Sequence, residues 1–258
     1  MNHYLILALV VFSYMLFWFV VSICIKRNDV ADIAWGLGFV VVAWFSYFLS
    51  DQSLKALLVN MMVTIWGLRL SWHIFLRNKG KTEDFRYHQW RMEWKHFYLR
   101  SFLQVFMLQG LFLFITLLPV IYINAHSAFR FHFLDGAGIL IWLTGFYFES
   151  AGDYQLKQFK SKPENKGKII STGLWRYTRH PNYFGEVVQW WGIFIMAVTL
   201  PGGWMTIAGP LTITYLVRYV SGVPMLERKY AGNPEFEAYK KRTSVFFRYR
   251  PKPHTCTN

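Results

Sequence analysis

The segment 173–186 reads GLWRYTRHPNYFGE and lies directly before an apolar stretch. It combines two arginines, a histidine, an asparagine and a carboxylate. Unpaired charge is expensive at a membrane border, so a purely structural protein has little need of such a set. The segment therefore indicates a site for a water-soluble, anionic partner.

Other polar residues interrupt or end the apolar stretches. Arg69, His73 and Arg77 are spaced i, i+4 and i+8, so a helix would carry them on one face. Glu149 and Asp153 are spaced i and i+4, which gives a pair of carboxylates on one helix face. Further polar groups of this kind are Asp32, Glu186, Gln189 and Arg218. We expect these groups to line a pocket that opens to the cytoplasm and reaches into the bilayer.

The composition is that of a membrane protein. Of the 258 residues, 54% are hydrophobic and 20% aromatic, and the net charge is +14. The basic residues lie in short loops between apolar stretches, so membrane topology explains the charge better than a nucleic-acid partner. Two cysteines, Cys24 and Cys256, indicate neither a disulfide framework nor a metal cluster. We expect one integral membrane domain over 1–258, with its main motifs in 133–250.

The apolar stretches predict an all-α, polytopic fold, because about 20 apolar residues cross a bilayer as a helix. We expect a Lys-rich loop over 153–172. If the loops alternate sides, 24 of the 28 Lys and Arg residues fall on one side. The positive-inside rule then places the N-terminus outside and the C-terminus in the cytoplasm. The seven predicted spans are 4–25, 30–50, 54–76, 101–123, 133–150, 186–200 and 204–221.

Each polar group also has a structural interpretation. Arg77 suits a topology charge that reaches the interface. Arg69 suits an ion pair with Asp32 or Glu149, and the carboxylates at 149 and 153 suit partners for nearby lysines. His180 and the proline after it suit the start of a helix, with Asn182 as its cap. These interpretations do not explain why all of the groups are predicted on one side of the membrane.

The sequence resembles the steroid 5α-reductase C-terminal-domain-like membrane proteins, and most closely their bacterial-type branch. The segment 173–186 is the most specific part of a resemblance that covers nearly the whole chain. The other motifs are ADIAWG at 31–36, WGLRLS at 66–71, EDFRY at 83–87, GF at 145–146 and SGVP at 221–224.

The resemblance implies a seven-helix fold that binds NADPH from the cytoplasm and reduces a carbon–carbon double bond conjugated to a carbonyl in a lipophilic substrate. Asn182, Tyr183 and Glu186 match positions that hold the nicotinamide half of the cofactor. Asp153 matches an aspartate that contacts the cofactor, whereas Glu149 stands where the reductases carry an asparagine. The remaining residues predicted to bind the cofactor are Arg69, Arg77, Arg179, His180 and Arg218.

The reduction also requires an acid that polarises the substrate carbonyl. The reductases use a tyrosine and a glutamate, and no motif places that pair in this sequence. Asp32 and Tyr87 are the catalytic residues that we predict in their place.

Two other classes of function remain open. Arg179 to Gly185 also match the Arg-His-Pro-x-Tyr-x-Gly motif of isoprenylcysteine-type and phospholipid methyltransferases, which use S-adenosylmethionine. Glu227 lies in a tail similar to theirs, but Leu226 replaces one of their paired glutamates. A lipid-binding or transport protein is the third class, and the lack of an inverted repeat disfavours transport. In each case the partners are the bilayer and a lipophilic molecule, with no obligate protein partner. We expect the inner membrane of a bacterium or the endoplasmic reticulum of a eukaryote.

Overall fold

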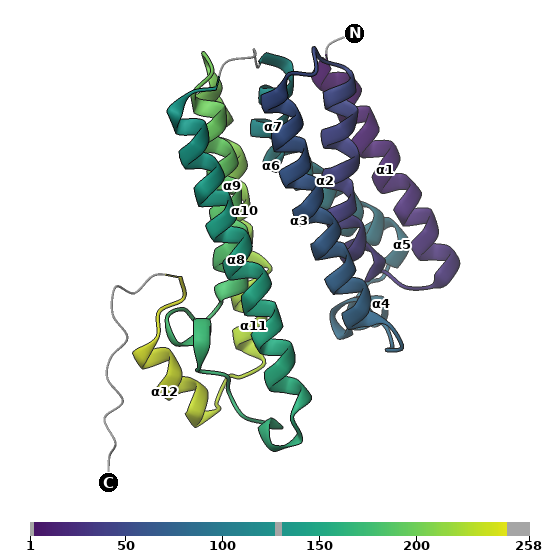
Figure 1. The fold of residues 1–258 in the computed structure, drawn as a ribbon. Coiled ribbons are helices and arrows are strands. Elements are labelled where there is room, and N and C mark those ends of the chain that lie inside the picture. Colours follow the sequence, from purple (N-terminus) through teal and green to yellow (C-terminus); the bar gives the residue numbers. More distant parts are fainter. Residues whose placement is uncertain (1–2, 127–130, 247–258) are drawn as a thin grey trace. The chain divides into compact units, whose positions relative to one another are not determined.

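The computed structural model describes residues 3–126 and 131–246, and the regular structure in these ranges is entirely helical (Figure 1). The predicted all-α class is therefore confirmed. The chain divides into two compact units. The first unit comprises Met1–His132 and Met196–Gly209, and the second unit comprises Phe133–Ile195 and Pro210–Asn258.

Three long helices begin the first unit: α1 (His3–Ile25), α2 (Val30–Phe48) and α3 (Leu54–Asn78). Their bounds agree with the predicted spans to within two residues. The Ser53 side chain caps α3 by accepting a hydrogen bond of 3.1 Å from the backbone N–H of Ala56. This cap satisfies one of the N–H groups that a helix start otherwise leaves unpaired.

The α2–α3 contact depends on two glycines. A Cβ atom on Gly36 would lie 2.6 Å from the carbonyl oxygen of Gly67, and the converse distance is also 2.6 Å. The two backbones can therefore approach only because neither residue has a side chain. Beside this point, Ser71 Oγ donates to the carbonyl of Ile33 at 2.9 Å. This contact fixes how the first turn of α2 faces α3.

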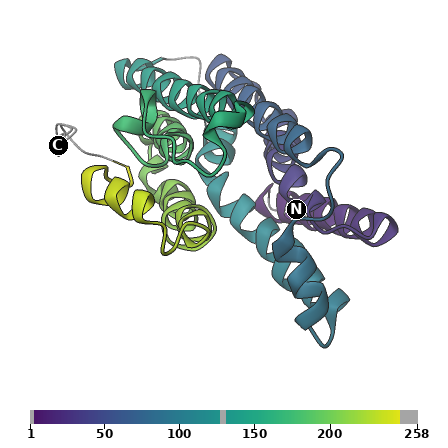
Figure 2. The same cartoon turned by 90° about the horizontal axis from the view of Figure 1, so that it is seen from below.

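The predicted span 101–123 is divided in the structure. The helices α4 (Phe85–Glu93) and α5 (Phe97–Arg100) lead into a π-helical segment, Ser101–Met107, and then into α6 (Leu108–Thr116). The π-helical segment and α6 pack on α1, as the view from below shows (Figure 2). A separate helix, α7 (Leu118–His126), follows. The division has a physical reason, since Pro119 has no N–H to donate into the preceding turn.

Four helical stretches in the described part of the chain are long and apolar enough to cross a membrane. They are His3–Ile25, Val30–Phe48, Leu54–Asn78 and Phe97–Thr116. Helix α1 also exposes large apolar side chains such as Phe17, which suits contact with lipid. The chain is therefore a multi-pass membrane protein, while the count of seven spans and their orientation stay predictions.

The second unit is built on α8 (Phe133–Ser161) and α9 (Pro181–Val198), which continues into the first unit beyond residue 195. The prediction of a loop over 153–172 is wrong for its first part, because α8 continues to Ser161. No Gly or Pro occurs between Asp153 and Ser161, so the first breaker is Pro163. Helix α9 begins five residues before the predicted span, with proline at its first position, where no N–H is needed.

The predicted seventh span is a composite of segments. A 3-10 turn, Gly203–Ile207, precedes α10 (Ala208–Tyr215), and a π-helical segment, Leu216–Val220, ends it. Two short helices follow, α11 (Val223–Arg228) and α12 (Pro234–Arg242). Figure 1 shows α12 near the end of α8 that carries Ser161.

Helices α8 and α9 pack antiparallel through glycines spaced seven residues apart. A Cβ atom on Gly145 would lie 2.6 Å from the carbonyl oxygen of Gly185 and 2.7 Å from the backbone nitrogen of Gln189. A Cβ atom on Gly192 would lie 2.7 Å from the carbonyl oxygen of Gly138. Small residues at such crossings let helices in a membrane approach closely. The side chains that flank the glycines are consequently held at short range.

We expect Gly145→Ala to destabilise the protein, because the new methyl group would overlap backbone atoms that cannot move without separating α8 from α9. The loss should be about 1–3 kcal/mol, as for other overpacked cores. Gly136→Ala is the matched control on the same helix, since nothing lies within 4 Å of a Cβ there. Thermal unfolding in detergent measures both variants. Equal unfolding temperatures for the two would contradict the close approach.

Candidate functional site

In the first unit, the structure brings the two predicted catalytic residues together. Asp32 lies in the first turn of α2, and Tyr87 lies on α4. The Tyr87 hydroxyl donates to Asp32 Oδ1 at 2.6 Å, and Arg86 Nη2 donates to Asp32 Oδ2 at 2.9 Å. Both oxygens of this carboxylate thus accept hydrogen bonds from α4, one from a phenol and the other from a guanidinium.

The start of α4 is fixed by its own cap. Asp84 Oδ1 accepts from the backbone N–H of Arg86 at 3.1 Å and from its Nε at 2.9 Å. The guanidinium therefore bridges Asp84 and Asp32. The Tyr87 side chain is buried, with 3% of the residue exposed. Burial, followed by the nearby Asp32 carboxylate, raises the pKa of Tyr87 well above its ordinary value of 10.0. The phenol is consequently protonated at neutral pH.

A second network ties the segment before α4 to the α1–α2 loop. Glu83 Oε1 accepts from Arg91 Nη2 at 3.0 Å and from the backbone N–H of Asn28 at 2.6 Å. The Asn28 side chain in turn donates to Ser101 Oγ at 2.6 Å. These contacts fasten both ends of α4 beside the start of α2, so the Tyr87–Asp32 distance is fixed by the fold.

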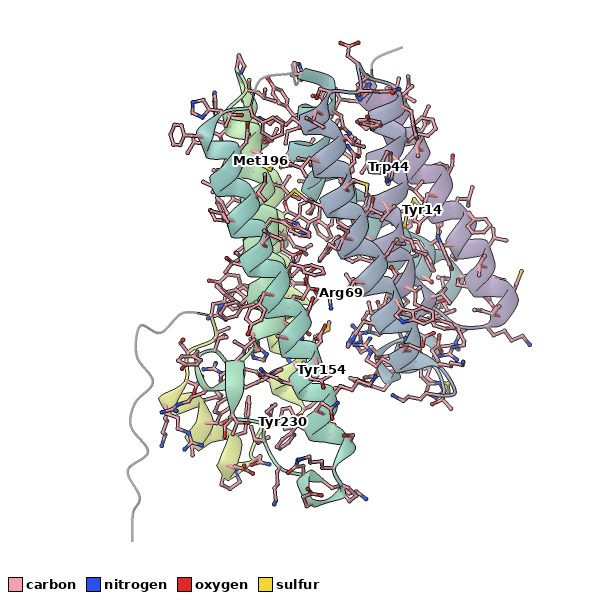
Figure 3. The ribbon with its side chains drawn as sticks, viewed as in Figure 1. Tyr14, Trp44, Arg69, Tyr154, Met196 and Tyr230 are labelled. Carbon is pink, nitrogen blue, oxygen red and sulfur yellow. The ribbon has the colours of Figure 1, made fainter. Side chains whose placement is uncertain are left out.

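The predicted stripe of Arg69, His73 and Arg77 lies on α3, as expected, and His73 is half-buried. Arg69 is half-buried, and Figure 3 shows it on the helix. Arg77 is exposed and donates from Nε to Asn78 Oδ1 at 3.3 Å. The one face of α3 therefore carries a half-buried and an exposed cation.

In the second unit, carboxylates on α8 accept hydrogen bonds from amides on α9. Asn182 Nδ2 donates to Asp153 Oδ1 at 3.0 Å, and Gln189 Nε2 donates to Glu149 Oε2 at 2.5 Å. Glu149 and Gln189 are buried. The amide oxygens Asn182 Oδ1 and Gln189 Oε1 are also buried, and neither has a hydrogen-bond partner within residues 3–126 and 131–246. Four of the polar groups in this unit therefore form two parallel pairs.

A third carboxylate, Glu227 of α11, binds the start of α9. Its Oε1 lies 2.9 Å from His180 Nε2 and 3.0 Å from Arg179 Nε. Arg179 and His180 are both buried. Burial raises the pKa of Glu227, but the hydrogen bonds from His180 and Arg179 outweigh it and lower the pKa to about 2. Burial lowers the pKa of His180, and the hydrogen bond to Glu227 opposes this shift only in part. At neutral pH the pair is therefore a carboxylate and a neutral imidazole.

Residues of the segment 173–186 also hold the chain after α12 in place. Arg179 donates through its backbone N–H to the carbonyl of Ser244 at 2.9 Å, and through Nη1 to the carbonyl of Thr243. Tyr239 donates through its hydroxyl to the carbonyl of Trp175. An apolar cluster of Ile169, Phe236 and Tyr239 lies beneath these contacts, and Tyr230, labelled in Figure 3, packs against it. Arg179 thus holds the tail through several of its donors.

The other predicted residues lie around these pairs. The Tyr183 ring stacks on His180 with 5.7 Å between centroids, and Glu186 is buried on α9. Arg218 is half-buried, with its guanidinium 5.1 Å from the centroid of the Tyr219 ring. The predicted residues gathered in the second unit are Glu149, Asp153, Arg179, His180, Asn182, Tyr183, Glu186 and Arg218.

Arg86, Gln189 and Glu227 were not predicted as catalytic or cofactor-binding residues, although Gln189 was expected to line the pocket. Arg86 and Tyr87 belong to the EDFRY motif, which therefore already carried the signal. Gln189 follows Asn182 by seven residues and so shares its helix face. Glu227 was recognised only as part of the methyltransferase-like tail, because its contact with His180 joins residues 47 positions apart.

We expect the Glu227 contacts to make the stability depend on pH. Since the folded-state pKa is depressed from 4.5 to about 2, the contribution is present above the ordinary value and is lost as the pH falls towards 2. Glu227→Gln should remove this part of the acid sensitivity. It should also destabilise the protein by about 3 kcal/mol, because it leaves the Arg179 charge without its carboxylate.

Thermal unfolding in detergent, followed from neutral to acidic pH, measures this effect. Glu237→Gln is the matched control, since that carboxylate is exposed on α12 and pairs with Lys240 at 3.2 Å. If the Glu227 and Glu237 variants showed the same stability and the same pH profile, the contacts of Glu227 with Arg179 and His180 would not stabilise the protein.

Comparisons with known proteins identify the family. The family described as "Protein of unknown function (DUF1295)" matches residues 18–243. The mouse 3-oxo-5-alpha-steroid 4-dehydrogenase 1 is 34% identical over 65 residues, which are 25% of this chain and 26% of that protein. The human protein of the same name is 33% identical over 70 residues, 27% of this chain and 26% of that protein.

A plant relative gives a similar match. The steroid 5-alpha-reductase DET2 of Gossypium hirsutum is 35% identical over 60 residues, 23% of each chain. The matches thus span about a quarter of the length of these relatives. No solved structure is significantly similar to the chain. Because the family match covers most of its length, the protein belongs to the DUF1295 family of steroid 5-alpha-reductase-like membrane proteins.

Proposed function

We propose that the protein is a membrane-embedded reductase that uses NADPH to reduce a carbon–carbon double bond conjugated to a carbonyl in a lipophilic substrate. The observation that carries this proposal is the hydrogen bond between the buried Tyr87 hydroxyl and the half-buried Asp32 carboxylate. The sequence showed no motif for the required acid, yet two separate segments supply a phenol and a carboxylate in contact. The similarity to the steroid 5-alpha-reductases supports the same class of reaction.

The second unit contains groups that fit the cofactor. The nicotinamide half of NADPH bears a carboxamide and ribose hydroxyls, all of which donate hydrogen bonds. Asn182 Oδ1 is a buried acceptor without a partner in the described ranges. The amide nitrogen of the same side chain donates to Asp153, so Oδ1 is the amide atom that remains for a ligand. In this proposal Asn182, with Tyr183 and Glu186 beside it on α9, binds the nicotinamide half.

When bound, the cofactor supplies a hydride to one carbon of the double bond. The chain must then supply a proton to the electron-rich enolate that results. Tyr87 keeps its proton at neutral pH because burial raises its pKa. Asp32 orients the hydroxyl, and the charge of Arg86 stabilises the Asp32 carboxylate. In this proposal the Tyr87 hydroxyl donates its proton to the enolate, and the tyrosinate that results regains a proton from water before the next turnover.

The membrane location supports a lipophilic substrate. The chain crosses the bilayer several times, so a lipid-like enone can reach it from the hydrocarbon phase. The cofactor is soluble and reaches the polar ends of the helices from water. The inner membrane of a bacterium, or the endoplasmic reticulum of a eukaryote, would provide both phases.

Cofactor identity is the first test. Purified protein in detergent should bind NADPH in an equilibrium titration and should not bind S-adenosylmethionine. Asn182→Ala should weaken NADPH binding by about tenfold, the effect of losing one strong hydrogen bond. Glu186→Gln is the companion variant for the carboxylate. If wild type bound S-adenosylmethionine and not NADPH, the protein would instead be a methyltransferase. If neither cofactor bound, the lipid-binding class would remain.

The proton donor is the second test. We expect Tyr87→Phe to lower turnover of NADPH with a 3-oxo-4-ene steroid or a shorter lipophilic enone by about 10²–10⁴-fold, as for the loss of a general acid. Its NADPH affinity should stay unchanged, and Asp32→Asn should lower turnover as well. Tyr98→Phe is the matched control, because that side chain is exposed. Wild-type turnover in the Tyr87 variant would sink the assignment.

A further inference from the structure

Three polar side chains, one just before α9 and two on it, share one arrangement. His180, Asn182 and Gln189 each direct a nitrogen at a carboxylate, namely Glu227, Asp153 and Glu149. Each also has a second polar atom that is buried and has no hydrogen-bond partner in the part of the chain that the structure describes. These atoms are His180 Nδ1, Asn182 Oδ1 and Gln189 Oε1.

The orientation of Gln189 follows from its surroundings. Its Nε2 lies 2.5 Å from Glu149 Oε2 and 3.3 Å from the carbonyl oxygen of Gly185, and both of these are acceptors. The opposite amide orientation would place oxygen against oxygen twice, so the NH₂ group must face them. The residue is 1% exposed. Gln189 Oε1 is therefore fixed as an acceptor inside the protein.

The tautomer of His180 follows in the same way. The Glu227 carboxylate is an acceptor, so His180 Nε2 carries the proton that it receives at 2.9 Å. His180 is also 1% exposed. A neutral imidazole has one donor and one acceptor, and Nδ1 is consequently the acceptor.

Buried acceptors of this kind are expensive unless a donor reaches them. Each one that lacks a partner costs about 1–3 kcal/mol, and a partly satisfied polar network is worse than an apolar core. The same pattern occurs at His180, just before α9, and at Asn182 and Gln189 on α9, each time with a carboxylate that determines which atom remains an acceptor. A hydrogen-bond donor from a ligand would remove the cost at each of these atoms.

We propose that His180 Nδ1 and Gln189 Oε1, together with Asn182 Oδ1, accept hydrogen bonds from the amide and hydroxyl groups of the nicotinamide–ribose half of the cofactor. We call these three atoms the acceptor row. Glu227 and Glu149 are its positioning residues. The inference rests on the proposed function, which placed only Asn182 in this role by geometry. Phosphate oxygens are acceptors themselves, so the acceptor row excludes the phosphate groups of the cofactor.

Two variants test the acceptor row while they keep the size of the surrounding side chains. His180→Gln keeps a nitrogen that can donate to Glu227 but removes the acceptor at the Nδ1 position. Glu149→Gln keeps the shape of that side chain but lets the Gln189 amide turn over. The exposed residues His96 and Glu237 provide the matched controls, His96→Gln and Glu237→Gln.

The readout is equilibrium binding of two cofactor fragments, reduced nicotinamide mononucleotide and 2′,5′-ADP, together with thermal unfolding. Each test variant should bind the nicotinamide fragment about 3- to 10-fold more weakly, the effect of one hydrogen bond, and should bind 2′,5′-ADP as wild type does. The controls should bind both fragments normally. Unfolding temperatures close to wild type would exclude a general loss of structure.

Two results would overturn the acceptor row alone. In one, wild type binds NADPH and both test variants bind the nicotinamide fragment normally. In the other, the variants weaken both fragments equally, which indicates a merely structural role. If wild type bound neither NADPH nor the nicotinamide fragment, the proposed function would fail and the acceptor row with it.

Discussion

A carboxylate taken out of water must be surrounded by donors, and this constraint organises both units. Asp32 is bound by a phenol and a guanidinium, and Glu227 by an imidazole and a guanidinium. A carboxylate accepts hydrogen bonds only, so every partner must turn an N–H or O–H toward it. The partner's other polar atoms are thereby directed elsewhere. The ion pairs thus determine which atoms the protein can present to a ligand.

The carboxylates can act in this way only because the helices are close. At Gly145 and Gly185 the backbones of α8 and α9 have no room for a Cβ atom, and a side chain as short as Asp153 can reach the neighbouring helix. Larger residues at the crossing would separate the helices and break these short hydrogen bonds. The glycines and the polar pairs therefore depend on each other, because the spacing of the two backbones sets the hydrogen-bond lengths.

The sequence predicts the fold class and the first helices well, because α1 to α3 are long apolar stretches with clear ends. The prediction of helix ends is wrong where a helix leaves the apolar stretch. Helix α8 continues through charged residues to Ser161, because residues with high helix propensity follow the apolar stretch. Asp32 and Tyr87 could be named singly from their motifs. Their contact could not, because it joins residues 55 positions apart and depends on how α4 folds back.

The segment 173–186 makes many of its polar contacts within the protein. Arginine and histidine beside each other indicate phosphate binding, yet Arg179 and His180 both bind Glu227, and Arg179 also holds the chain at 243–244. The positive charge of Arg179 and the N–H groups of both residues are thus used within the second unit. The buried polar atoms of the segment that have no partner in the described ranges, His180 Nδ1 and Asn182 Oδ1, are acceptors, which suit amides and hydroxyls. The phosphates of a charged cofactor would consequently need cations other than Arg179, and the two halves of such a molecule would be recognised by different chemistry.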